Sequence, residues 1–154
     1  MLTATPHGLF SWGFTVRQDG NTIADIDPSW FGERAEIRAG GQTYAAYREG
    51  LLAGTFVLQS GERALARAQK VSAFARAFAV DLAGRPLELK ATSVWGREFR
   101  LFEGGVPVGR IGPAGWFGRQ AVIDLPPDVP LPAQLFLLWL VLVLWRRADA
   151  AAGG

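Results

Sequence analysis

Few side chains in this sequence could support acid–base, nucleophilic or metal chemistry. His7 is the single histidine, and the chain has no cysteine. Thiol catalysis, disulfides and histidine-rich metal sites are therefore excluded. A histidine that acts as a general base needs a partner and a pocket, whereas His7 stands in a Pro-Gly context near the N-terminus. We expect His7 to be an exposed or capping residue, and the serines, which lack a histidine partner, are not expected to act as nucleophiles.

Two further patterns could be taken for reactive sites. Asp25 and Asp27 fall on one face of a strand, with Asp19 nearby, but Asp27-Pro28 is typical of the start of a turn. We favour the turn over a catalytic carboxylate pair. The glycine-rich segment 109–115 lacks the Lys-Ser/Thr of a phosphate-binding loop and a following helix, so it is also predicted to be a turn. The sequence thus predicts no catalytic, cofactor-binding or metal-ligating residue, and a protein that is not an enzyme.

The arginines are the more informative charged residues. The formal net charge is only +2 and the basic residues are scattered, so no nucleic-acid partner is expected. Arg146 and Arg147 directly follow the apolar C-terminal segment. They either compensate the dipole of a helix that ends there, which we favour, or contact anionic lipid head groups, at about 1 kcal/mol per cation. Whether a second set of arginines shares one face depends on the strand register: Arg97, Arg100, Arg110 and Arg119.

The C-terminal segment predicts a helix over residues 131–147, followed by a disordered tail at 148–154. Pro132 suits a first helical turn, and residues 135–145 form an unbroken apolar run. Residues 131–145 would span only about 22 Å as a helix, less than the roughly 30 Å of a bilayer core. Because the helix is apolar on every face, it must be enclosed by protein or by lipid. We favour burial in the protein, and a membrane anchor is the alternative.

Before this helix, turn signals recur about every ten residues, which predicts an all-β domain built from hairpins. The expected strands are residues 9–18, 21–27, 33–39, 42–48, 51–59, 63–70, 73–82, 86–94, 97–103, 106–112 and 118–125. Residues 62–80 have helical propensity, but the hairpin rhythm favours two strands broken near Val71. Four tryptophans near strand ends are expected to cap the barrel described next, and an interfacial membrane belt is the alternative: Trp12, Trp30, Trp95 and Trp116.

These elements combine into one domain over residues 1–154. A sheet of many hairpins leaves exposed edges unless it closes into a barrel. A barrel of about 12 strands has a lumen that its own side chains cannot fill, and an all-apolar helix would fill it. The sequence therefore predicts a mainly β fold, a closed antiparallel β-barrel around a buried hydrophobic C-terminal α-helix.

The order of these parts resembles the tubby C-terminal-like superfamily, which includes phospholipid scramblases and plant LURP-one-related proteins. The similarity covers about residues 8–147 and looks like that of a minimal, bacterial-type member. It rests on Ala66-Arg-Ala-Gln-Lys70 before a Phe-rich strand, Val108-Gly-Arg-Ile111, Trp116-Phe-Gly118, Ile123-Asp-Leu125 and Asp128-Val129 before the apolar helix. Trp30-Phe-Gly32 repeats the Trp-Phe-Gly motif near the other end of the chain.

The resemblance implies a twelve-stranded barrel and a binding or regulatory role rather than catalysis. Tubby domains bind phosphoinositide head groups through basic surface residues, and scramblases are associated with Ca²⁺-linked lipid movement. The acidic Ca²⁺ segment is reduced here to Asp124 and Asp128, too few for an ion that takes six to eight oxygens. We therefore expect a cytoplasmic monomer that binds an anionic phospholipid, a membrane surface, another anionic ligand or a protein partner. The alternative is a membrane-associated protein, anchored by its C-terminal helix, with a scramblase-like lipid role.

Overall fold

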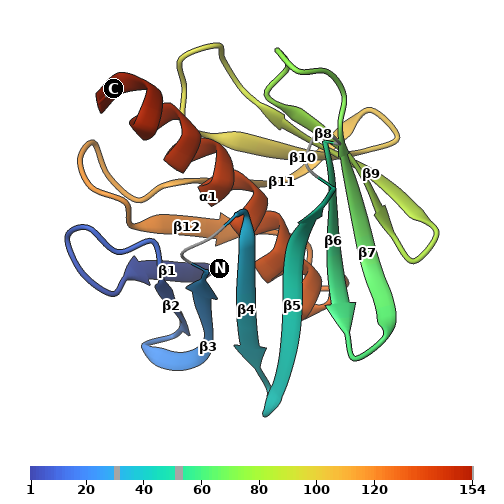
Figure 1. The fold of residues 1–154 in the computed structure, drawn as a ribbon, viewed down its shortest axis with the longest axis horizontal. Coiled ribbons are helices and arrows are strands. Elements are labelled where there is room, and N and C mark those ends of the chain that lie inside the picture. Colours follow the sequence, from blue (N-terminus) through green and yellow to red (C-terminus); the bar gives the residue numbers. More distant parts are fainter. Residues whose placement is uncertain (30–31, 51–53, 154) are drawn as a thin grey trace.

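The chain forms a closed antiparallel barrel with one helix inside it (Figure 1). The computed structural model describes residues 1–29, 32–50 and 54–153. The strands are β1 (Leu2–Pro6), β2 (Phe14–Gln18), β3 (Asn21–Pro28), β4 (Arg34–Ala39), β5 (Gln42–Glu49), β6 (Thr55–Ser60), β7 (Arg63–Lys70), β8 (Ala77–Leu82), β9 (Arg85–Ala91), β10 (Phe99–Glu103), β11 (Val106–Pro113) and β12 (Ala121–Asp124). Each strand pairs with its sequence neighbours, and β1 pairs with β12 to close the barrel.

The strands form because apolar and polar side chains alternate along them. In β4, Ala35, Ile37 and Ala39 are buried, whereas the intervening Arg34, Glu36 and Arg38 are exposed. Successive side chains of a strand point to opposite faces of a sheet, so the apolar set lines the lumen and the charged set faces outward. The barrel wall is thus polar outside and apolar inside.

The two ends of the barrel differ in their connections. Five two-residue turns lie at one end, which we call the turn end: residues 19–20, 40–41, 61–62, 83–84 and 104–105. Asp19 and Gly20 both have positive φ, 51° and 80°, as a tight type I′ hairpin requires. Because all neighbouring strands are antiparallel, six longer connections lie at the other end, the loop end: the described parts of residues 7–13, 29–33, 50–54, 71–76, 92–98 and 114–120.

Helix α1 (Leu131–Gly153) fills the barrel. Residues 135–145 are buried on every side of the helix, and Trp139 packs edge-on against Phe56 of β6, with ring centroids 5.8 Å apart. The described residues contain no buried polar or charged side chain. The helix crosses from the turn end and emerges at the loop end, where Figure 1 shows its C-terminus. The barrel wall therefore encloses the apolar segment that the sequence required to be hidden.

The fold class is confirmed, and several details of the prediction are corrected. Residues 62–80 do form two strands, β7 and β8. The strand β1 was not predicted, and residues 9–13 lie in a loop instead of a strand. The helix does not stop at residue 147, and residues 148–153 are helical instead of a disordered tail, because this stretch is rich in alanine, the strongest helix former. Trp30 and Phe31, from the first Trp-Phe-Gly motif, lie outside the described residues.

Two further expectations concern local structure. Asp27 and Pro28 are the last residues of β3 and do not open a turn. Most of the glycine-rich segment 109–115 lies in β11, where a side chain on Gly109 would come within 2.7 Å of the Asp124 carbonyl oxygen. Gly109 therefore allows the backbones of β11 and β12 to approach closely. Within the described part of the chain, no helix has the length and hydropathy needed to cross a bilayer.

Candidate functional site

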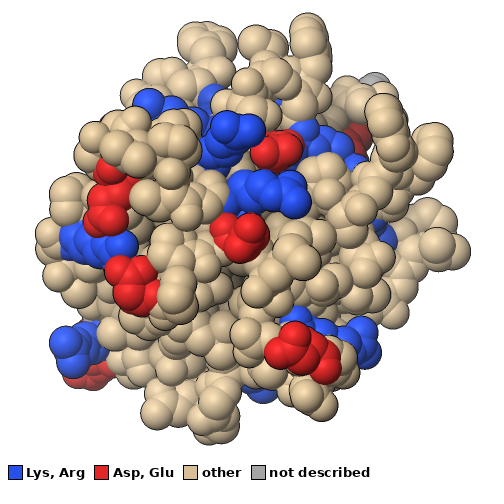
Figure 2. Space-filling model, turned by 180° about the vertical axis from the view of Figure 1, so that it is seen from behind, with Lys and Arg blue, Asp and Glu red and all other residues tan. Residues whose placement is uncertain are grey.

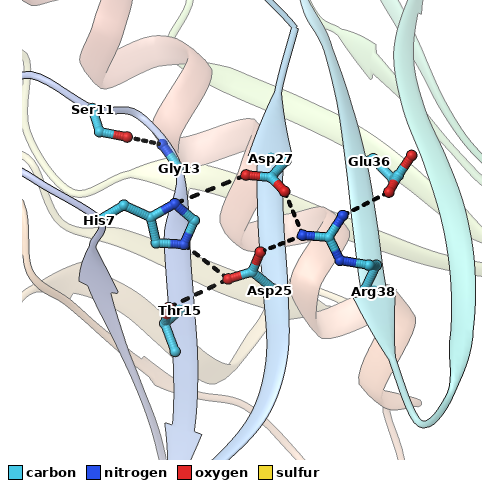
Figure 3. Close-up of polar contacts among 8 residues, drawn as sticks. All are labelled: His7, Ser11, Gly13, Thr15, Asp25, Asp27, Glu36 and Arg38. Carbon is cyan, nitrogen blue, oxygen red and sulfur yellow. Dashed lines mark hydrogen bonds and ion pairs between the residues drawn. The ribbon is translucent and has the colours of Figure 1, made fainter.

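The first candidate is a network of five charged or titratable side chains on the outer wall, which we call the His7 cluster: His7, Asp25, Asp27, Glu36 and Arg38 (Figure 3). His7 Nε2 lies 2.8 Å from Asp25 Oδ1, and its Nδ1 lies 3.8 Å from Asp27 Oδ1. Arg38 donates to Asp25 Oδ2 and to Glu36 Oε1, both at 2.7 Å, and also to Asp27. The cluster joins the first loop to β3 and β4.

Strand register assembles this cluster. Asp25 stands directly opposite Arg38, and Asp27 stands opposite Glu36, in the β3–β4 pair. Two residues apart on one strand, Asp25 and Asp27 point to the same face. His7 reaches them from the β1–β2 loop, where its amide donates to the Gly13 carbonyl at 2.9 Å. His7 is exposed, as expected, but it has a carboxylate partner that the sequence did not reveal.

The chemistry open to the His7 cluster is limited by Arg38. The cluster brings together one imidazole nitrogen and two carboxylates, and their ligand atoms lie within 4.8 Å of one another. Ligands of these types can bind a divalent cation. The same carboxylates already bind the Arg38 guanidinium, and hydrogen bonds to Asp27, Glu36 and Asp25 raise the pKa of Arg38 above its ordinary value. A metal ion would have to displace that permanent cation. The hydroxyl of Thr15 donates to Asp25 Oδ1 at 3.3 Å, and that carboxylate is itself held by Arg38.

The second candidate is the loop end, where arginines gather around the helix terminus. In the described loops and the last turns of α1, five arginines are present: Arg76, Arg97, Arg119, Arg146 and Arg147. The same segments carry three acidic residues: Glu33, Glu98 and Asp149. The connections of the turn end, including residues 125–130, carry acidic Asp19, Glu62 and Asp128 and no basic residue. Among the described connecting segments and the last turns of α1, basic residues therefore occur only at the loop end.

The wall between the two ends has no such asymmetry. Basic and acidic side chains are interspersed over the face seen in Figure 2. Many of them form exposed pairs, such as Arg67 with Glu49 at 3.1 Å and Lys90 with Glu88. Exposed pairs of this kind contribute little to stability, about 0–1 kcal/mol, and they cancel one another's charge. An anionic ligand is thus favoured at the loop end and not along the wall.

Two of the loop-end arginines hold loop backbones in place. Arg76 donates to the carbonyl oxygens of Ser93, Val94 and Gly96 at 3.3, 3.0 and 2.6 Å. Arg119 donates to the Gly8 carbonyl at 2.7 Å and also to the carbonyls of Leu9 and Ser11. Partial burial lowers the pKa of Arg76. These two side chains are structural clamps, and each links one loop to a neighbouring loop.

Arg147 is also engaged, although not by the helix dipole that we favoured. Its Nε donates to Glu33 Oε2 at 2.7 Å, and Arg48 lies 3.2 Å from the same carboxylate. The helix continues to Gly153, so Arg147 is not in its last turn, where the dipole acts. Burial lowers the pKa of Lys70, and the positive charge of Arg147 lowers it further. Cations are therefore crowded at the helix exit.

Arg146 differs from its neighbours because it is exposed and no acidic side chain among the described residues pairs with it. It borders a cavity of about 370 Å³ between the β1–β2 loop, the end of β3 and the helix. The walls include Phe10 and Trp12 on one side and Pro28 on the other. Ligand cavities start at about this volume and combine apolar walls with a few polar groups. An available guanidinium beside aromatic rings suits an anion that carries an apolar body.

The four arginines that could have shared one face, Arg97, Arg100, Arg110 and Arg119, separate into two pairs. Arg100 and Arg110 stand opposite one another on β10 and β11, near Glu98. Arg97 and Arg119 lie in loops, over the rings of Trp145 at 4.2 Å and Trp12 at 4.9 Å. Trp12 is partly buried, as a capping residue would be, but Trp95 and Trp116 are almost fully exposed. The sequence singled out Arg146 and Arg147 as candidate lipid contacts, which stays a prediction, but it did not reveal the His7 cluster.

The structure is a β-barrel with a central helix and a cationic loop end. The fold alone does not assign the chain to a family. Comparisons with protein-family models, with curated proteins and with solved structures find no match to this chain. The resemblance to tubby C-terminal-like proteins stays a prediction. Function must therefore be inferred from the geometry of the loop end.

Proposed function

We propose that this protein is a binding module for anionic phospholipid head groups and that the loop end is its binding surface. The observation that carries the proposal is Arg146, an exposed cation without an acidic partner among the described residues, at the rim of an aromatic-walled cavity. A guanidinium presents a planar fork of donors that matches a phosphate. The predicted similarity to tubby-like proteins supports the same class of ligand.

A binding role fits the loop end better than a catalytic one. The His7 cluster, which could have supplied a base, uses its carboxylates to hold Arg38. The cluster also borders the cavity through Asp27, and Arg38 offsets the charge of that carboxylate. The concentration of arginines at the helix exit adds a favourable potential for an anionic surface. We therefore propose a protein that holds or senses a lipid head group without transforming it.

Flotation of the full chain with lipid vesicles tests this proposal. Wild type is expected to float with vesicles of phosphatidylcholine and phosphatidylserine but not with phosphatidylcholine alone, and salt should weaken the binding. Arg146→Glu replaces a positive charge by a negative one and so changes the charge by two units. At about 1 kcal/mol per unit of charge, this corresponds to roughly 30-fold weaker binding. The control Arg63→Glu makes the same change at an exposed arginine of the turn end and should bind as wild type does.

Two outcomes would count against this proposal. A wild-type protein that ignores anionic vesicles at low salt has no phospholipid function of the kind proposed. Equal losses in Arg146→Glu and Arg63→Glu would mean that only the net charge matters and that the loop end is not the binding surface.

A further inference from the structure

The loop end also carries nearly all the large apolar side chains that the described residues leave exposed. Ten such residues are exposed, and eight of them lie in loop-end connections, the exceptions being Met1 and Val106. They occur as two per loop: Leu9 and Phe10, Val71 and Phe74, Val94 and Trp95, Trp116 and Phe117. Six of them are 88–97% exposed, namely Leu9, Phe10, Phe74, Trp95, Trp116 and Phe117. We call these eight side chains the apolar tips.

Exposure of this kind is not general on this barrel. The five tight turns of the opposite end consist of aspartate, glutamate, alanine and glycine only. A single exposed apolar residue needs no explanation, but a group on one face marks an interaction site. Four different loops place tips at the same end because the antiparallel topology sends every second connection there.

From this arrangement we infer that the apolar tips insert into the interface of an anionic phospholipid bilayer. The barrel axis then lies closer to the bilayer normal than to the membrane plane. This inference rests on the proposed function, since it places the same end of the barrel against the same lipids. Tryptophan and phenylalanine favour the boundary between head groups and acyl chains. Arg146, which shares a cavity with Phe10, can bury its stem while its guanidinium group stays at the level of the phosphates.

The arginine clamps make these loops suited to a medium of low polarity. A backbone carbonyl that enters the bilayer interface loses water and needs another donor. Arg119 supplies donors to the carbonyls of Gly8 and Leu9, directly at the first tips. Arg76 does the same for Val94 and its neighbours. The clamps thus satisfy part of the backbone and also hold the tips in pairs, because each arginine comes from an adjacent tip-bearing loop.

A bilayer fits this surface better than a protein partner does. A protein interface has an apolar centre and a polar rim, whereas here the helix terminus with its cations lies among the loops that carry the tips. Arg146 shares a cavity with Phe10, Arg147 pairs with Glu33, and Trp145 Nε1 donates to the Arg97 carbonyl at 3.0 Å. Separate apolar side chains around a cationic centre match the interface of a fluid bilayer with negative phosphates. Each tip can enter such an interface independently of the others.

The test uses full-length protein, vesicles of phosphatidylcholine and phosphatidylserine, and the same vesicles with brominated acyl chains that quench nearby tryptophan. Wild type should bind and lose fluorescence to bromine. The double variant Trp95→Ser with Trp116→Ser should bind about a hundredfold more weakly, at about tenfold for each ring, and show less quenching. Val106→Ser, an exposed apolar residue of the turn end, is the control and should match wild type.

The outcomes separate this inference from the function on which it rests. Binding without bromine quenching, unaffected by the double variant and abolished by salt, overturns tip insertion but leaves head-group binding intact. Failure of wild type to bind anionic vesicles overturns both. The quenching of wild type is independent of the variants, so it decides between these outcomes even if the double variant folds poorly.

Discussion

Replacing Leu138 by aspartate tests the buried helix most severely. Leu138 lies in the buried part of α1 and is itself fully buried. Its surroundings are apolar throughout, since the described residues include no buried polar or charged side chain. A carboxylate at this position would have neither a hydrogen-bond donor nor a cation nearby. The variant Leu138→Asp should therefore fail to fold at neutral pH.

The magnitude follows from two contributions. Truncation of a buried leucine costs about 2–5 kcal/mol, which is the expected loss for Leu138→Ala. An unpaired charge in an apolar core costs several kcal/mol more. The sum is comparable with the roughly 5–15 kcal/mol by which a domain is stable. Leu138→Met, which nearly conserves volume, should cost less than about 1.5 kcal/mol.

Urea unfolding followed by circular dichroism measures these differences, with the midpoint and slope fitted for each variant. Ala150→Asp is the matched control, because it places the same charge on an exposed position of the same helix. It should cost no more than about 1.5 kcal/mol, from lost helix propensity and the unfavourable helix dipole. A Leu138→Asp protein with the midpoint and slope of wild type would refute the enclosed helix.

Three further predictions concern the outer wall and the loops. Arg38→Ala should allow Zn²⁺ to bind the His7 cluster in calorimetric titrations in which wild type binds weakly or not at all, and equal affinities would show that the arginine does not block the site. Because a hydrogen bond from Arg85 lowers the pKa of Glu103, the carboxylate stabilises the fold above about pH 4.3, and this contribution is lost as the pH falls further. The melting-temperature advantage of wild type over Glu103→Gln should accordingly be present at pH 7 and shrink below about pH 4.3, and a gap unchanged down to pH 2 would contradict the pairing. Arg119→Ala should speed limited proteolysis within residues 7–13 more than Arg100→Ala does, and identical cleavage rates would argue against the clamp.

Local sequence patterns predicted most of the barrel. Alternation in β4 and glycines at the tight turns are local signals, because a strand period and a positive φ leave traces in neighbouring residues. The strand β1 carries a weaker signal. It pairs with β12 through Leu2 and Ile123. This pairing is a long-range contact, and the residues near β1 in the sequence do not predict it. The helix end was placed too early because a basic pair was taken as a stop signal ahead of an alanine-rich segment.

The candidate sites were harder to predict because they depend on register and topology. His7 and Asp25 are 18 residues apart, and their contact requires the β1–β2 loop to fold back beside β3. Trp95 and Trp116 were expected to cap the barrel, since tryptophan at a strand end fits a cap and an exposed tip equally well. Only the alternation of connections between the two ends shows that these residues share one face.

The most direct test of the central claim is the binding of wild type to anionic vesicles, measured beside Arg146→Glu and Arg63→Glu at low and high salt. The expected result is binding that requires phosphatidylserine, falls about 30-fold in Arg146→Glu and stays at the wild-type level in Arg63→Glu. Absence of wild-type binding at low salt, or equal losses in the two variants, would contradict a phospholipid-binding loop end.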